Sequence, residues 1–168
     1  GVMEEAGQIA QTLAPALTRQ GQRDLSQALL QYSLLRRDRA EASEPLDALA
    51  KLQLEDGHLR SALRVYQEVI EALRESKDVV QRAYILIRAG SIQQQLSNYP
   101  QAIAHFQQAL TLMRKRNHQE GEAKSLHCLA VAHRESSASR QALVYSQAAM
   151  EAYQKLDYQL GIALMYQE

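Results

Sequence analysis

The sequence contains few of the residues that break helices, form disulfides or fill membranes. Its 168 residues include 7 glycines, 3 prolines, 1 cysteine and no tryptophan. The single cysteine, Cys128, excludes a disulfide within one chain and fits a reducing compartment, so we expect a cytoplasmic protein. No apolar run approaches the roughly 18 to 20 residues of a membrane-spanning helix. The acidic start Gly1–Glu5 lacks a signal-peptide pattern, and we expect no membrane insertion.

Neither sign of charge is in excess. The chain carries 19 lysines and arginines against 19 aspartates and glutamates, for a formal net charge of zero. Nucleic acids and anionic membranes attract proteins with a basic surplus. Nucleic acid is therefore not an expected partner.

Residues that favour helices are plentiful. Alanine, leucine, glutamine, glutamate and arginine dominate the composition, whereas β-branched residues are sparse. Ser43 ahead of Pro45 resembles a helix entry, and Pro100 falls in the first turn of another expected helix. Pro15 interrupts the first expected helix and predicts a kink or an early end there. The sequence predicts an all-α fold.

One alanine-centred segment occurs three times at a constant interval. The anchoring residues are Ala62, Ala102 and Ala142, so both intervals are 40 residues (102 − 62 and 142 − 102). A second set of small residues has the same spacing: Ala50, Gly90 and Ala130. A fixed period between 20 and 50 residues is the signature of a repeat architecture, in which each unit buries its apolar face against the next.

The period divides residues 1–168 into a single array. The expected units are a divergent helix pair at 4–38, repeats at 43–76, 78–115 and 118–155, and a further or capping helix beginning at 158–168. The last unit rests on an echo, because Gly121-Glu122-Ala123 returns as Gly161-Ile162-Ala163. A half-repeat cannot bury its face alone. We therefore expect either a piece of a longer protein or a capping helix.

Large apolar residues accompany the small ones at the same interval. They are Leu46, Leu86 and Leu126 on the first helices, with Tyr66 and Phe106 on the second helices. This alternation resembles the tetratricopeptide repeat, a helix–turn–helix unit of about 34 residues, in a longer variety of about 40 residues. The resemblance implies a right-handed superhelical solenoid of antiparallel helix pairs.

Several positions depart from the common pattern of that family. Gln53, Gln93 and His133 stand where a tyrosine is usual near the end of the first helix. Serine replaces the usual turn glycine at 97 and 137, and Ser146 replaces the aromatic residue found at Phe106. We therefore expect the third repeat to be the least tightly packed.

No constellation of catalytic residues is present. Cys128 follows His127, but neighbouring residues on a helix point about 100° apart, which favours a packing role for the cysteine over a thiolate–imidazole pair. His127 and His133 are six residues apart, a poor spacing for a shared metal on one helix. We expect neither an enzyme nor a cofactor.

The expected binding surface is the concave wall formed by the first helices of successive repeats. Its members are Lys51, Leu54, Tyr84, Ile87, Ser91, Gln94, Lys124, His127, Val131, Arg134 and Leu164. An apolar centre beside Lys124 and Arg134 suits a peptide or helical segment with a few acidic residues. The alternative is that these are ordinary solvated side chains.

Three functions fit this pattern. The leading hypothesis is a non-catalytic scaffold that binds a segment of a protein partner in the concave groove. The second is a ligand- or peptide-responsive regulatory domain of a larger signalling protein. The third is self-association into a homo-oligomer through the C-terminal segment Leu160–Tyr166.

Overall fold

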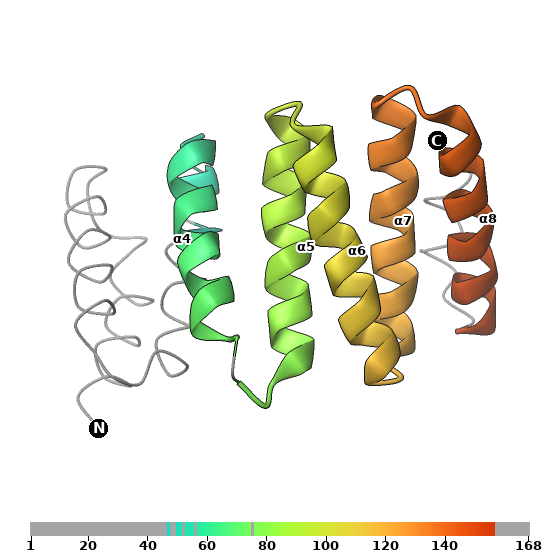
Figure 1. Cartoon of the computed structure of the whole chain (residues 1–168), viewed down its shortest axis with the longest axis horizontal. Coiled ribbons are helices and arrows are strands. Elements are labelled where there is room, and N and C mark those ends of the chain that lie inside the picture. Colours follow the sequence, from blue (N-terminus) through green and yellow to red (C-terminus); the bar gives the residue numbers. More distant parts are fainter. Residues whose placement is uncertain (1–46, 48–49, 52, 56, 75, 157–168) are drawn as a thin grey trace. The chain divides into compact units, whose positions relative to one another are not determined.

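The computed structural model describes residues 47, 50–51, 53–55, 57–74 and 76–156, and the statements that follow concern those residues (Figure 1). Their regular secondary structure consists of helices, which confirms the all-α prediction. The expected elements at 4–38 and 158–168 lie outside the described residues, as do Leu164 and the segment Leu160–Tyr166. The chain divides into two compact units, residues 1–76 and 77–168.

In the first unit, the described long helix is α4, Leu59–Ala72. Its buried residues recur at helical spacing: Ala62, Val65, Tyr66 and Val69. The turn before the helix contains Gly57 at φ 75°, a conformation that glycine adopts without steric cost. The Gly57 amide donates to the Leu54 carbonyl at 3.0 Å.

The second unit contains four helices of 17 residues each. They are α5 (Val79–Gln95), α6 (Tyr99–Lys115), α7 (Gln119–Glu135) and α8 (Ser139–Lys155). Helix α5 packs on α6, α7 packs on α8, α6 packs on α7, and the first helices α5 and α7 also contact each other. Within this unit α7 begins 40 residues after α5 (119 − 79), and α8 begins 40 residues after α6 (139 − 99).

Short turns close the helix pairs of the second unit. Ser97 and Ser137 occupy the left-handed region at φ 59° and 63°, at the positions where the family pattern has glycine. The amide after each serine donates back to the preceding helix, from Asn98 to the Gln93 carbonyl and from Ala138 to the His133 carbonyl, both at 2.8 Å. These bonds use carbonyls that a helix end leaves without a partner.

Small residues permit close approach between helices, as the repeat pattern predicts. Gly90 on α5 faces the ring of Phe106 on α6, and a β-carbon at Gly90 would lie 2.5 Å from Phe106 Cε1. Phe106 is fully buried. The anchoring alanines are also buried, with Ala62 and Ala102 at 0% exposure and Ala142 at 8%. The prediction that these alanines lie in the core is confirmed.

Candidate interaction surface

Helices α5 and α7 form the part of the expected wall that the structure shows. Both are first helices of their pairs, and they run in the same direction and contact each other (Figure 1). The expected residues recur at intervals of three, four and three on each helix, which places them on one helical face. On α5 these are Tyr84, Ile87, Ser91 and Gln94, and on α7 they are Lys124, His127, Val131 and Arg134.

Tyr84 and Lys124 meet at the N-terminal end of this surface. The Lys124 Nζ atom lies 5.8 Å from the centroid of the Tyr84 ring, within the range of a cation–π contact. The ring of His118 meets the same tyrosine edge-on, at 5.9 Å between centroids. Burial, and secondarily the nearby Glu120 carboxylate, raise the pKa of Tyr84. The tyrosine therefore remains a neutral phenol that can donate a hydrogen bond.

His118 is a functional residue that the sequence analysis missed. It is the N-cap of α7, where its Nδ1 accepts a hydrogen bond from the Gly121 amide at 3.0 Å. A β-carbon at Gly121 would collide with the Met113 side chain, so Gly121 permits the close approach of α6 and α7. His118 therefore fixes the start of α7 and supports the Tyr84 ring. Its position directly before the expected helix was the available signal.

The middle of the surface is partly buried. His127 on α7 is half-buried, and its ring meets Tyr153 of α8 edge-on at 6.3 Å. Ser91 is also half-buried and donates from Oγ to the Ile87 carbonyl at 3.0 Å. Val131 is half-buried, which leaves an apolar centre between the aromatic and charged side chains.

The C-terminal end of the surface is polar. Gln94 on α5 is half-buried and Arg134 on α7 is exposed. Lys124 at the opposite end is also exposed. Two cationic side chains therefore stand at the two ends of α7, and the less polar residues lie between them.

Ile87 requires a correction. It was expected on the binding wall, but the residue is only 4% exposed and belongs to the core. The three-four-three spacing identifies a helical face and cannot locate the border of that face, where neighbouring side chains cover a residue. Ile87 is therefore removed from the candidate surface.

The expected wall residues before residue 77 lie in the first unit. Lys51 is exposed and its Nζ pairs with the Asp47 carboxylate at 3.0 Å, one helical turn away. Leu54 is half-buried. The surface considered further consists of the α5 and α7 residues, all of which lie in the second unit.

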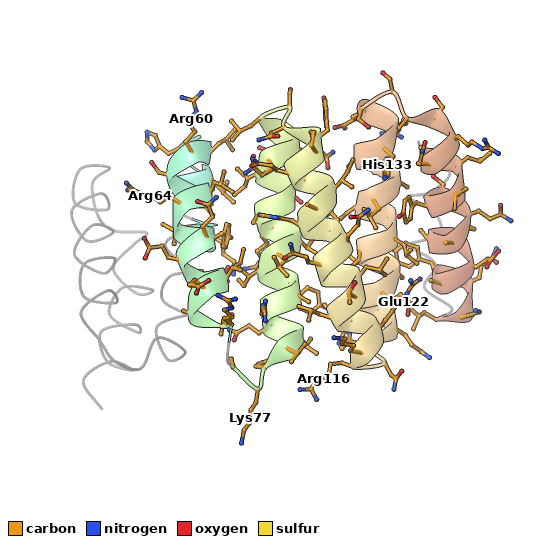
Figure 2. All side chains as sticks on the ribbon, in the orientation of Figure 1. Arg60, Arg64, Lys77, Arg116, Glu122 and His133 are labelled. Carbon is orange, nitrogen blue, oxygen red and sulfur yellow. The ribbon has the colours of Figure 1, made fainter. Side chains whose placement is uncertain are left out.

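The outer rim at the N-terminal ends of α5 and α7 is rich in charge. Arg116 Nη2 donates to the Lys77 carbonyl at 3.2 Å, and both residues lie at the same end of the helix pairs (Figure 2). Arg114 on α6 pairs with Glu122 on α7, at 2.8 Å from Nε to Oε1. These contacts link the ends of consecutive repeats and leave the α5–α7 face to other partners.

Within the described part of the chain, no three histidine, cysteine, aspartate or glutamate side chains are placed to hold a metal ion. None of the helices described there has the length and apolar character needed to cross a membrane.

A family model for the tetratricopeptide repeat matches residues 81–155, which include nearly all of α5 through α8. This part of the chain belongs to the tetratricopeptide repeat family. Repeats of this family generally act as protein-interaction scaffolds and not as catalysts. No curated protein sequence is similar enough to count as a match.

Solved tetratricopeptide-like structures share the fold at low sequence identity. Aspartyl phosphate phosphatase F from Bacillus subtilis is 14% identical with a TM-score of 0.74, over 88% of this chain and 38% of that one. BtubC from P. vanneervenii is 20% identical with a TM-score of 0.67, over 84% and 58%. Nearly identical TPR-like repeats from Podosopora anserina are 15% identical with a TM-score of 0.69, over 98% and 85%. The chain thus spans about two fifths of the phosphatase and somewhat over half of BtubC.

Proposed function

We propose that this chain is a non-catalytic protein-interaction module and that a peptide or helical segment of its partner lies along the α5–α7 face. The observation that carries the proposal is the contact between two parallel first helices, with Lys124 of one held over the Tyr84 ring of the other. Exposed or partly exposed tyrosine, valine and arginine side chains line one continuous face. Tyrosine and arginine are among the residues that contribute most to binding at protein interfaces.

The charges on this face favour a partner with acidic residues. Lys124 and Arg134 are ten residues apart on α7, which corresponds to about 15 Å along the helix axis at about 1.5 Å per residue. An extended peptide advances roughly 3.3 to 3.6 Å per residue, so two carboxylates four or five residues apart match both cations. Val131 offers an apolar contact between them.

The test is a selection followed by matched charge reversals. Twelve-residue peptides are selected from a random display library on the 168-residue chain, and the enriched peptides are then measured against purified variants. Replacing Lys124 and Arg134 together by glutamate should weaken binding by roughly tenfold or more, since like charges then face each other.

The control reverses two exposed charges on second helices, Lys115→Glu and Lys155→Glu, which alters net charge equally. This control should retain the affinity of the original chain. Equal affinity of the selected peptides for the Lys124/Arg134 variant and the original chain would assign binding to another face.

A further inference from the structure

The outer side of α8 carries two large apolar side chains in water. Leu143 is 70% exposed and Val144 is 63% exposed, and they are the exposed large hydrophobic residues of the described chain. Val144 belongs to a stripe spaced by four, three and four residues. The stripe consists of Arg140, Val144, Gln147 and Glu151, all of them exposed, and is called here the α8 stripe.

The α8 stripe lies on a side that neighbouring repeat helices do not cover. Its counterpart on α6, 40 residues earlier, is Pro100, Ala104, Gln107 and Thr111, and all four are exposed. Helix α6 packs on both α5 and α7, yet these neighbours leave that side open. The exposure of the α8 stripe therefore follows from its position on the outer face and not from a missing neighbour within the described repeats.

Opposite charges mark the two ends of the α8 stripe. Arg140 and Glu151 are 11 residues apart, or about 16 Å along the axis, and a rotation of about 100° per residue brings them to the same face. Within the described part of the chain, neither forms an ion pair. This layout is self-complementary, because reversing the direction of a second α8 exchanges the two ends.

We infer that the α8 stripe is a self-association surface whose occupant is the α8 stripe of a second copy, running antiparallel. A two-fold axis through the centre of the stripe places Arg140 of each copy opposite Glu151 of the other, giving two equivalent ion pairs. In the same register Val144 faces Gln147. The two Val144 residues are then about 4.5 Å apart along the axis, at about 1.5 Å per residue.

The apolar residues supply the centre of this contact. Both copies of Leu143 fall on the same side of the seam, since a two-fold axis perpendicular to the helices preserves that side. The two Leu143 and two Val144 side chains, exposed in one copy, cover each other in the pair. A parallel arrangement would place Arg140 against Arg140, so charge selects the antiparallel one.

Helix α4 shows what prevents such pairing. Its outer stripe, 80 residues earlier, is Arg60, Arg64, Gln67 and Glu71, with the same residue types at both ends and in the third position. Arginine 64 stands where α8 has Val144, so an antiparallel pair of α4 helices would bring two guanidinium groups together near the axis. The apolar residue at 144 therefore distinguishes the two stripes.

The first test measures the mass of the full 168-residue chain by sedimentation equilibrium over a wide range of concentration. The original chain should show a monomer–dimer equilibrium. Val144→Arg, which copies the residue of α4, should raise the dissociation constant by roughly tenfold or more. The matched control is Ala104→Arg on α6, an exposed position of the same stripe in another repeat, and it should leave the equilibrium unchanged.

The second test exchanges the charges and keeps the inference falsifiable if one variant loses its fold. Arg140→Glu and Glu151→Arg should each weaken self-association, because each places like charges at both ends of the seam. Mixing the two variants should restore a dimer, since every contact then joins glutamate to arginine. A monomeric original chain at millimolar concentration, or a mixture that stays monomeric while both variants are folded by circular dichroism, would overturn the inference.

Discussion

Helices α6 and α8 have equal length and equivalent positions in their pairs, yet they bury different amounts of side chain. Helix α6 buries Phe106 and Met113 completely and leaves Leu110 7% exposed. Helix α8 buries Ala142, Ala149 and Tyr153 and exposes Leu143. One reason is their neighbours, because α6 packs on both α5 and α7 whereas α8 packs on α7 among the described helices.

The second reason is a single residue. Phe106 fills the space beside Gly90, and its equivalent on α8 is Ser146, which is half-buried beside a helix that carries Ala130 in place of Gly90. A serine cannot occupy the volume of a phenyl ring. The expectation of looser packing in the third repeat agrees with this difference. A repeat period thus specifies equivalent helices without specifying equal burial.

The largest effect should come from removing the ring that separates the two helices. Phe106→Ala should lower the free energy of unfolding by about 3 to 5 kcal/mol, because a large buried side chain is lost and a cavity remains. Denaturant unfolding measures the change. Ser146→Ala at the equivalent position of α8 should alter it by less than about 1 kcal/mol. A loss below about 1 kcal/mol for Phe106→Ala would contradict its place in the core.

The next effect should come from adding a methyl group at Gly90. Gly90→Ala places a β-carbon against the Phe106 ring and should cost about 1 to 3 kcal/mol of unfolding free energy. The same change in a Phe106→Ser background copies the Ala130–Ser146 pair of the following repeat and should cost less. A double-mutant cycle from denaturant curves gives the coupling, and equal costs in both backgrounds would show that the ring is not what excludes the methyl group.

A smaller effect, of opposite sign, should follow from restoring glycine in the turns. Ser97→Gly relieves a non-glycine residue in the left-handed region and should raise the free energy of unfolding by about 1 kcal/mol. Ser137→Gly should act similarly in the other pair. Thermal melting of both variants provides the comparison, with Gly57→Ala as the reverse control that should destabilise. A fall in melting temperature for Ser97→Gly would mean that its side chain makes a stabilising contact.

The smallest effect should be a loss of stability in mild acid. Burial lowers the pKa of His105 on α6 and that of His133 on α7, so the folded protein favours both neutral imidazoles. Between these lowered values and the unfolded value near 6.5, the unfolded chain binds more protons, and unfolding free energy rises with pH there. This contribution is complete above about pH 6.5 and is lost as the pH falls through the folded values.

Unfolding free energy measured in a series of buffers checks this sign. His105→Gln should flatten the dependence, whereas the equivalent residue on α8 is Tyr145, which stacks on His133 at 5.2 Å and does not titrate in this range. Stability that increases on acidification through the same interval would contradict the burial of the neutral rings.

The sequence by itself determined the helices of this protein, their interval and the small residues between them. These features are local: composition sets helix propensity, and a serine or glycine in a left-handed turn ends each first helix. The match of Tyr84 with Lys124 was also predictable, because equivalent positions on parallel helices lie side by side. The pairing of opposite charges along α8 is likewise readable once the helix is known.

Only the tertiary structure decided which side chains those helices hide. It placed Ile87 in the core, made His118 the cap of α7 and support of Tyr84, and left Leu143 and Val144 in water. Burial depends on which other helices arrive beside a residue and how far their side chains reach. That information belongs to contacts between distant segments, and periodicity within one helix does not contain it.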